Sequence, residues 1–315
     1  MKRASIITLQ YVDNYGSVLQ AYATQKIVEK FGYRAEILNY IRDNCRYEYL
    51  KKDAYLRYRS RNDIFSFFPI AKLLQYRWII KYKRRALVFD AFRNKHLLLS
   101  EEYSSLEELK KNPPEADINI TGSDQVWNTE YNGGILEEYF LTYVPKDKRK
   151  IAIAASFGLD QIAKADINII GSLISTYKGI SVREESSLSI LQAAGYPEGI
   201  CILDPTLMLS KEEWISKLSL KFTKIRYVFV YQLNENSEML RFASEIACDC
   251  NIQLIIITNS NVKLDCNYSI LGNIAPDVFL EYLLNAEYIV TDSFHGAAFS
   301  FNFNKDVFIF FPKRK

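Results

Sequence analysis

Residues 4–40 read ASIITLQYVDNYGSVLQAYATQKIVEKFGYRAEILNY, and this stretch decides the fold class. The apolar run Ala4–Leu9 predicts a β-strand, and a polar turn follows it. Over residues 17–31 the apolar positions recur at helical spacing, and Gly32 is of the residue type that commonly ends a helix. Glu36–Tyr40 then returns as a second strand. A strand, a helix and a strand in this order predict one unit of a mainly parallel sheet.

The same alternation continues along the chain and arranges it as two domains. The first series has further strand candidates at residues 117–121, 150–155, 179–182 and 201–203. The second series has strand candidates at residues 227–232, 253–258, 288–291 and 307–311. Between the two series, Ser210 and Glu213 have the spacing of a helix capping box. We therefore predict an α/β protein with two Rossmann-like doubly wound domains, residues 1–210 and 211–315.

The composition of the 315 residues excludes several classes of protein. Because 49% of the residues are hydrophobic and 24% are charged, the chain is expected to be folded and globular rather than disordered. A net charge of +3 argues against a protein whose whole surface binds nucleic acid. The two histidines, and five cysteines without a CxxC pair, favour free thiols in a reducing compartment over a zinc site. No metal is therefore expected.

The N-terminal stretch MKRASIITL indicates a cytoplasmic protein. It has no secretory apolar region or cleavage site, and it is typical of a first strand. No stretch of the sequence approaches the ~18 consecutive apolar residues of a membrane span. The expected location is therefore the cytoplasm, with peripheral binding at the inner face of the membrane if the basic segment described next contacts lipid.

A basic, aromatic segment interrupts the alternation near residues 45–95. Residues 55–95 contain eleven lysines and arginines but only two carboxylates, Asp63 and Asp90. Aromatic residues are interleaved with these charges, namely Phe65, Phe67, Phe68, Tyr76, Trp78 and Tyr82. One interpretation is a surface for an anionic membrane or a glycan-lipid acceptor. The other is a helical insertion whose apolar stripe packs on the domain and whose cations face water.

Polar side chains follow nearly every predicted strand. Ligands of open parallel sheets bind outside the carboxyl ends of the strands, so these positions are candidates for a site. In chain order they are Asn14, Gly16 and Ser17; Ser123, Asp124 and Gln125; Ser156 and Gly158; Arg183 and Glu184; Asp204; and Asp292, Ser293, His295 and Gly296. Each turn alone is weak evidence, because strand-to-helix turns favour such residues for backbone reasons.

His295 and Arg183 are the strongest candidates among these positions. His295 lies between a predicted strand and a helix start that suits a phosphate or carboxylate, and Gly296 beside it would let a ligand approach the backbone. Arg183 could bind either anion bidentately, or it could pair with Glu184, Glu185 or Asp204. Asp124 could be catalytic, or it could satisfy backbone donors of its own turn. His96, Trp127 and Trp214 are expected to serve surface or packing roles.

Six stretches of the sequence together resemble the polysaccharide pyruvyl transferase family. They are Asn-Tyr-Gly-Ser-Val-Leu-Gln-Ala (14–21), Thr-Gly-Ser-Asp-Gln-Val-Trp-Asn (121–128), Ala-Ala-Ser-Phe-Gly (154–158), Ser-Val-Arg-Glu (181–184), Asp-Pro-Thr-Leu (204–207) and Asp-Ser-Phe-His-Gly (292–296). Singly each is unspecific, but they occur in the family's order and run through nearly the whole chain. Residues 45–90 match nothing in this pattern.

The resemblance implies a fold, a donor and an acceptor. The fold is glycosyltransferase-B-like, with the two domains facing across a cleft. The donor is phosphoenolpyruvate as a co-substrate, with no other cofactor, and the acceptor is a sugar of a cell-surface polysaccharide or its lipid-linked precursor. Arg183 and His295 match the positions expected to hold the donor. Similar proteins continue with a helix after the 307–311 strand, so either the second domain is shortened at its end or the C-terminal part is absent from this sequence.

Ketal formation of this kind needs cations for the donor, a proton donor and a base. Arg183 with the helix start at Gly296 would supply the first, and His295 would be the acid or a phosphate ligand. The base is open between Asp124, Glu184 and Asp292. The substrate is expected to contact the remaining strand-end residues, Asn14, Gly16, Ser17, Ser123, Gln125 and Ser293.

Two rival functions are compatible with the same architecture. A nucleotide-sugar-dependent glycosyltransferase would need a carboxylate for the ribose hydroxyls. Asp292 could serve, but no acidic residue ends the strand at 253–258. A non-catalytic, glycan-binding protein would keep the basic aromatic surface and bind no small anion.

Overall fold

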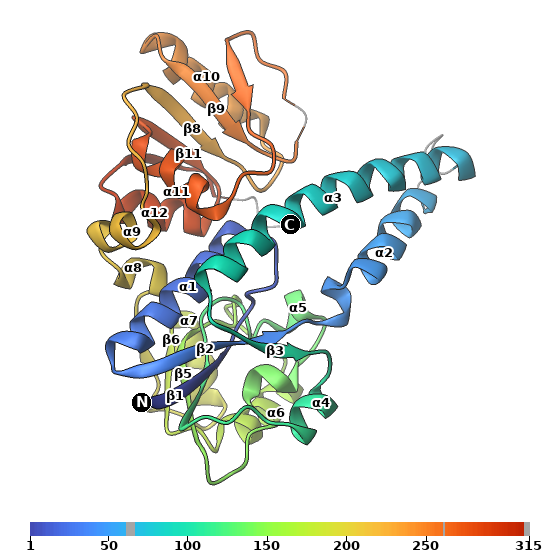
Figure 1. The fold of residues 1–315 in the computed structure, drawn as a ribbon, viewed down its shortest axis with the longest axis vertical. Helices are drawn as coiled ribbons and strands as arrows, with labels where there is room; N and C mark the ends of the chain where they lie inside the picture. Colours follow the sequence, from blue (N-terminus) through green and yellow to red (C-terminus); the bar gives the residue numbers. More distant parts are fainter. Residues whose placement is uncertain (61–66, 261, 312–315) are drawn as a thin grey trace. The chain divides into compact units, whose positions relative to one another are not determined.

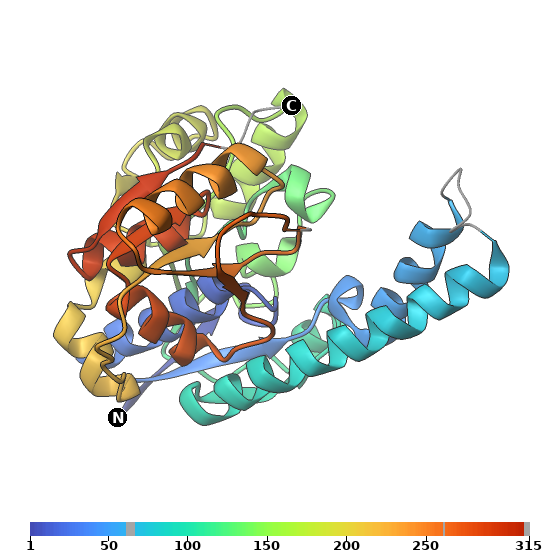
Figure 2. The same ribbon diagram turned by 90° about the horizontal axis from the view of Figure 1, so that it is seen from above.

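The chain forms two compact units, Met1–Met208 (unit 1) and Leu209–Lys315 (unit 2) (Figures 1 and 2). The structure is a computed structural model, and it describes residues 1–60, 67–260 and 262–311. The charges of Arg61 and Asp63 and the ring of Phe65, which belong to the predicted basic segment, lie outside the described residues.

Unit 1 is built on a seven-stranded parallel sheet of order β3-β2-β1-β4-β5-β6-β7. Its strands are β1 (Lys2–Ile7), β2 (Tyr33–Tyr40), β3 (Leu99–Tyr103), β4 (Ile118–Thr121), β5 (Arg149–Ala155), β6 (Gly179–Val182) and β7 (Ile200–Cys201). Its helices are α1 (Tyr15–Lys30), α2 (Tyr47–Arg59), α3 (Phe68–His96), α4 (Leu106–Lys111), α5 (Thr129–Asn132), α6 (Lys164–Ile174), α7 (Glu185–Ala193) and α8 (Pro205–Met208), with 3₁₀ turns at Asp43–Cys45 and Glu137–Phe140. The strand order reverses between β1 and β4, so this junction is the switch point at which such sheets bind ligands.

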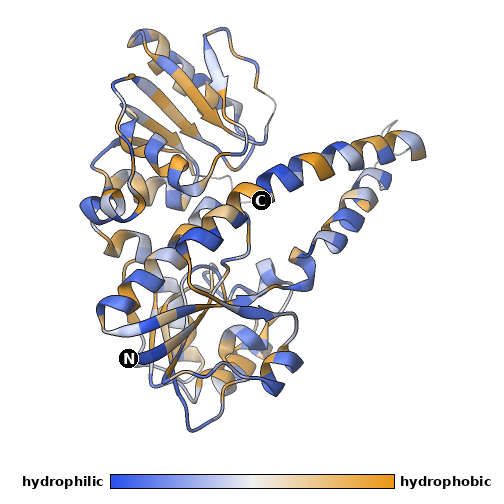
Figure 3. Cartoon of the chain, viewed as in Figure 1, coloured by the Kyte–Doolittle hydropathy of each residue, from blue (hydrophilic) through white to orange (hydrophobic). Residues whose placement is uncertain are grey.

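Unit 2 repeats the winding with five parallel strands in the order β10-β9-β8-β11-β12. They are β8 (Tyr227–Tyr231), β9 (Gln253–Ile257), β10 (Tyr268–Ile270), β11 (Tyr288–Thr291) and β12 (Asp306–Ile309), with helices α9 (Lys211–Leu218), α10 (Ser237–Asp249), α11 (Pro276–Asn285) and α12 (Phe294–Asn302). Every residue of β8 is buried, as is typical of a strand covered on both faces, and β8 and β9 are strongly hydrophobic in Figure 3. The two-domain, doubly wound α/β class is therefore confirmed.

Local signals explain where several helices begin and end. The Asn14 side chain caps α1 by accepting from the backbone N–H groups of Gly16 and Ser17, and Gly32 follows the helix with φ +82°. Ser210 and Glu213 form the predicted capping box of α9. Strand β3, which the sequence analysis missed, reads Leu-Ser-Glu-Glu-Tyr and pairs only with β2. An edge strand half exposed to water needs no apolar run, so its sequence carries little strand signal.

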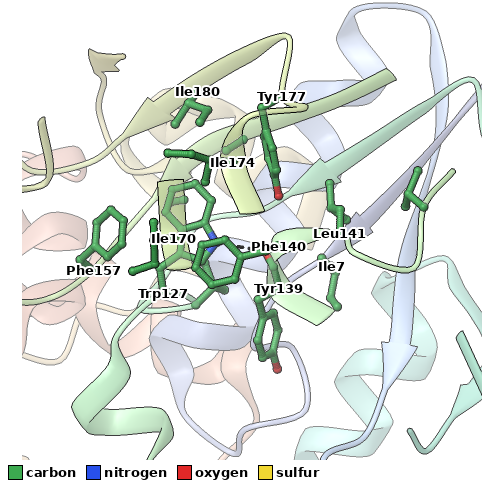
Figure 4. Packing of buried hydrophobic residues seen from close by; sticks show 14 of the residues in the cluster. Ile7, Trp127, Tyr139, Phe140, Leu141, Phe157, Ile170, Ile174, Tyr177 and Ile180 are labelled. Carbon is green, nitrogen blue, oxygen red and sulfur yellow. Dashed lines mark hydrogen bonds between the residues drawn. The ribbon is translucent and has the colours of Figure 1, made fainter. Parts of the chain in front are cut away.

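A buried aromatic cluster in unit 1 fixes two loops at the strand ends (Figure 4). The Trp127 indole N–H donates to the carbonyl of Tyr139 at 3.0 Å, and the ring stacks on Phe140 with centroids 5.2 Å apart. Phe157 lies against the same indole, also at 5.2 Å between centroids. Trp127 follows β4 and Phe157 follows β5, so packing of these two rings in the core fixes the loops after both strands. Trp127 and Trp214 are both buried, which confirms their packing roles.

The basic segment forms a hairpin of the two helices α2 and α3. They lie side by side in Figures 1 and 2, and the Gln75 side chain donates to the carbonyl of Lys51 at 2.8 Å. Among the residues that the structure describes, no helix is both long and apolar enough to cross a membrane.

The second half of α3 holds the loop that joins β1 to α1. The Arg93 guanidinium contacts the Asp13 carboxylate at 2.8 Å and the carbonyl of Gln10 at 3.3 Å. Arg85 donates twice to the carbonyl of Asp13, at 2.6 and 3.0 Å. Burial raises the pKa of Asp13 although Arg93 opposes the shift. This half of α3 therefore packs on the domain, as one of the two interpretations predicted, with Phe89 and Phe92 buried; Arg85 and Arg93 bind the loop, however, whereas that interpretation had the cations face water.

Candidate active site

Two side chains meet across the switch point of unit 1. Ser17, in the first turn of α1, donates its hydroxyl to Oδ2 of Asp124 at 2.6 Å. Asp124 follows β4, and its Oδ1 accepts the backbone N–H of Gln125 at 2.9 Å. Its backbone has φ +77°, in the left-handed region that aspartate tolerates better than most residues. The carboxylate is thus held by its own strained turn after β4 and by α1, the helix that follows the neighbouring strand β1.

Arg183 lies at the centre of a buried group of three carboxylates. Its Nη1 donates to Oδ2 of Asp204 at 3.0 Å, and its Nη2 lies 3.5 Å from Oδ1 of Asp124. Its Nε lies 3.5 Å from Oε2 of Glu184, and only 8% of the Arg183 side chain is exposed. Burial lowers the pKa of Arg183, but the charges of Asp124, Asp204 and Glu184 outweigh burial and raise it. The geometry therefore fits the alternative in which Arg183 pairs with Asp204 and Glu184.

Each carboxylate of this cluster also binds the loop around it. Asp204 accepts the backbone N–H of Thr206 at 2.9 Å, its hydroxyl at 2.7 Å and the hydroxyl of Ser123 at 3.1 Å. Oε1 of Glu184 accepts the hydroxyl of Ser187 and the backbone N–H groups of residues 157 and 158. One guanidinium thereby ties together the loops after β4, β5, β6 and β7.

A β-bulge in β5 aligns these loops. Ala154 has φ +50°, and the pairing of β5 with β6 shifts between Ala152 and Ala155. The Ser181 hydroxyl donates to the carbonyl of Ala152 and accepts the N–H of Ala154, both at 3.0 Å. The bulge lets Ala155 pair with Asp124 in an isolated bridge.

Several predicted substrate contacts are engaged in shaping the loops. The Gln125 side chain accepts from Nδ2 of Asn128 at 2.9 Å, and a Cβ at Gly158 would lie 2.7 Å from both side chains. Gly158 also has φ +62°, so this turn requires glycine twice over. Asn14 caps α1, as described above. Contacts of these residues with a substrate stay predictions.

Unit 2 has a similar connection across its own switch point, between β8 and β11. Asp292 follows β11 and accepts the backbone N–H groups of Leu233 at 2.7 Å and Asn234 at 2.8 Å. It also accepts the Asn234 side-chain amide at 3.0 Å. Asp292 therefore fixes the loop after β8.

His295 is the second residue of α12, directly after this junction. Ser293 caps the helix by accepting the N–H of Gly296 at 3.2 Å. His295 is buried, and its ring lies edge-on to Phe294, which is 54% exposed, with centroids 5.0 Å apart. The helix start thus presents a buried imidazole next to an exposed ring.

Gly296 is required by packing inside unit 2. A Cβ at this position would lie 2.5 Å from Oγ1 of Thr291 and 3.2 Å from Cδ1 of Tyr231. The close approach predicted for a ligand is therefore made by β11 and β8 themselves.

We expect Gly296→Ala to destabilise unit 2 by about 1–3 kcal/mol, the usual cost of forcing atoms into a packed interior. The free energy of unfolding in urea, followed by circular dichroism, measures the effect. Gly272→Ala is the matched control, because a Cβ there meets nothing within 4 Å. Equal stability of the two variants would contradict the packing argument.

The structure joins some predicted site residues and leaves others in separate units. Ser17, Ser123, Asp124, Arg183 and Glu184 form one network in unit 1. Ser293, His295 and Gly296 gather at α12 in unit 2. The sequence analysis included Asp204 among the strand-end candidates but gave it no role in catalysis or substrate binding, and it did not select Ser181, Ser187 or Thr206. In the described ranges, no three His, Cys, Asp or Glu side chains are grouped so that they could hold a metal ion.

Comparison with known proteins identifies relatives at the level of the family. The model of the polysaccharide pyruvyl transferase family matches residues 14–310, which is nearly the whole chain. No curated protein sequence matches the chain significantly.

Solved structures with similar folds share little sequence with the chain. A UDP-N-acetylglucosamine 2-epimerase from Rickettsia bellii is 12% identical, with a TM-score of 0.45 over 98% of this chain and 78% of that one. The E. coli heptosyltransferase WaaC with ADP is 8% identical, with a TM-score of 0.42 over 97% and 86%. UGT89C1 from Arabidopsis thaliana, complexed with UDP-L-rhamnose, is 12% identical, with a TM-score of 0.46 over 98% and 79%.

Proposed function

Since this chain belongs to the polysaccharide pyruvyl transferase family, we propose that it transfers a pyruvyl group from phosphoenolpyruvate to two hydroxyls of one sugar. The acceptor sugar belongs to a cell-surface polysaccharide or to its lipid-linked precursor. The products are a pyruvate ketal and inorganic phosphate. The observation that carries the proposal beyond family membership is the Ser17–Asp124–Arg183–Asp204 network at the switch point of unit 1.

The reaction proceeds by addition of one hydroxyl across the donor's double bond and substitution of phosphate by a second hydroxyl at the same carbon. Protonation of the methylene carbon makes C2 of the donor electrophilic, and the first sugar hydroxyl attacks it. The C2–O bond to phosphate then breaks, and the second hydroxyl closes the ketal. The two hydroxyls release two protons, one of which balances the proton taken up by the methylene carbon, while the departing phosphate can take up the other. The protein must supply an acid, a base and groups that bind the donor anions.

Asp124 is the base that the geometry favours among the three candidates. Oε1 of Glu184 binds the loop after β5, and Asp292 accepts three N–H groups from the loop after β8. Asp124 lies at the switch point and accepts the hydroxyl of Ser17. A sugar hydroxyl could take the place of the Ser17 hydroxyl as the donor to this carboxylate. Arg183 then acts as a positioning residue, because its guanidinium contacts the Asp124 carboxylate and fixes its orientation.

His295 is the acid or the phosphate ligand in this proposal. It occupies the first turn of α12, where the helix dipole favours an anion, and Ser293 orders that turn by capping it.

The nucleotide-sugar alternative has less support from the residues of unit 2. Its one candidate carboxylate for ribose hydroxyls was Asp292. Both oxygens of Asp292 already accept N–H groups from residues 233 and 234. A ribose would have to displace these hydrogen bonds, which a site built for ribose would not require.

Calorimetric titration of the whole chain with phosphoenolpyruvate, UDP and CMP tests the proposal. We expect phosphoenolpyruvate alone to bind, and a suitable acceptor glycan to release inorganic phosphate from it. Binding of UDP or CMP instead would favour a glycosyltransferase. Binding of none of the three would favour the non-catalytic, glycan-binding alternative.

A further inference from the structure

Helix α3 carries an exposed apolar stripe along the face turned away from α2. Its members are Leu73, Tyr76, Ile80 and Leu87, which are 60%, 61%, 38% and 69% exposed. At about 3.6 residues per turn, these four positions fall within an arc of about 60° around the helix axis. This is the spacing of one continuous helix face rather than of scattered surface residues.

The opposite face of α3 packs against α2 and against the loop between β1 and α1. Ala71, Gln75 and Trp78 face α2 there, with Ala71 and Gln75 buried. Phe89 and Arg93, on the same side, are buried against the loop between β1 and α1. The stripe therefore lies outside the core of the hairpin, which is formed by the opposite side of α3.

Positive charges border the stripe on both sides. Arg77, Lys81 and Arg84 lie along one border, Lys83 lies along the other, and all four are exposed. The nearest carboxylate on the helix, Asp90, lies on the same border as Lys83, two turns further on, where its charge is paired with Arg93 at 2.7 Å. The exposed face thus combines aliphatic and aromatic side chains with cations and has no neighbouring acid between residues 67 and 89.

We propose that this face of α3 docks on the surface of an anionic phospholipid bilayer. The four apolar side chains would enter the boundary between headgroups and acyl chains, and the four cations would contact lipid phosphates. An anionic glycan would match the cations but leave the apolar side chains in water. A second copy of the chain, related by a two-fold axis, would bring the same cations opposite each other. The inference goes beyond the proposed function and does not rest on it.

Vesicle co-sedimentation tests the docking surface without any substrate. The whole chain is mixed with vesicles of phosphatidylcholine alone, or of phosphatidylcholine and phosphatidylglycerol in equal parts. We expect binding to the second kind only, and weaker binding at high salt because exposed charges are screened. No binding to the anionic vesicles would overturn the proposal.

Two sets of variants locate the surface on the chain. R77Q/K81Q/R84Q should weaken binding at least about 30-fold, since each cation near an anionic surface contributes substantially. The matched control K146Q/K148Q/R149Q removes the same three charges from another exposed site in unit 1 and should bind nearly as the parent does. An equal loss of vesicle binding in both variants would show that only the net charge of the protein matters, and it would overturn the assignment of the docking surface to α3.

The apolar part is tested by L73S/I80S. This variant should weaken binding at least about tenfold, because it removes two apolar side chains that would be buried in the membrane. Its control is F31S/I169S, at two exposed apolar positions, one directly after α1 and one in α6. All variants change exposed residues, and circular dichroism checks that they remain folded. Self-association of the parent chain that L73S/I80S abolishes, without vesicle binding, would identify a second copy as the occupant and overturn the proposal.

Discussion

Replacing Arg183 by Ala is expected to destabilise the chain by about 3–5 kcal/mol, the usual result of removing one partner from a buried ion pair. The substitution would leave Asp124, Asp204 and Glu184 close together without their shared cation. The loss of the cation is most unfavourable for Asp204, because none of its side chain is exposed to water. Urea unfolding followed by circular dichroism measures the loss. At temperatures where the variant is folded, turnover should fall at least about 100-fold, because Asp124 loses its orientation.

Arg226→Ala is the control that separates burial from pairing. Arg226 makes two contacts of 2.7 Å with Glu287, shorter than any made by Arg183, but 63% of its side chain is exposed. We expect its removal to destabilise the chain far less than removal of Arg183, because exposed ion pairs contribute little. If both variants lost the same stability, the argument from the buried carboxylates would be wrong. Arg183→Lys should fall between parent and Arg183→Ala, because an ammonium keeps the charge but cannot reach three carboxylates in a planar arrangement.

Replacing His295 by Ala is expected to reduce turnover at least about 100-fold, the scale of losing one acid–base group. The measurement is phosphate release from phosphoenolpyruvate with a saturating acceptor, together with the Kd of the donor. If the imidazole is the acid, the rate falls while the Kd changes little. If it binds the donor phosphate, the Kd rises as well.

His96→Ala is the natural control, since the chain has two histidines. His96 ends α3, and its ring packs against Phe92 at 4.6 Å and Tyr22 at 6.1 Å between centroids. Its substitution should leave turnover within about twofold of the parent, as expected for a packing residue remote from the transition state. Near-normal turnover of His295→Ala in a folded protein would remove His295 from the mechanism.

The elements that the sequence predicted well are those whose signals are local. The apolar spacing and Gly32 marked α1, and Ser210 with Glu213 marked the start of α9. The polar ends of the parallel strands located Ser17, Asp124 and Arg183 at one edge, because parallel strands bring their carboxyl ends together. These signals act within a few residues, so no tertiary contact is needed to interpret them.

What the sequence did not reveal depends on partners far along the chain. The pairing of Arg183 with Asp124 joins residues 59 positions apart, and the Ser17–Asp124 bond joins residues 107 apart. The bulge at Ala154 has no local marker, because the hydroxyl that stabilises it comes from Ser181 on the next strand. The sequence left open whether Arg183 binds an anion or pairs with carboxylates, and only the fold shows that Asp124, Glu184 and Asp204 all lie around its guanidinium.

The two faces of α3 determine how far from the lipid headgroups the loop before Asn14 would lie. Its packed face holds the loop before Asn14, and its opposite face carries the lipid-docking stripe. Because the faces are opposite, one helix diameter, about 10–12 Å, would separate that loop from the headgroups. This spacing corresponds to only the first few sugars of a lipid-attached glycan. If α3 docks as proposed, acceptors with short glycans should therefore be modified more readily than long polymers, and a detergent that strips the protein from vesicles should abolish this length preference.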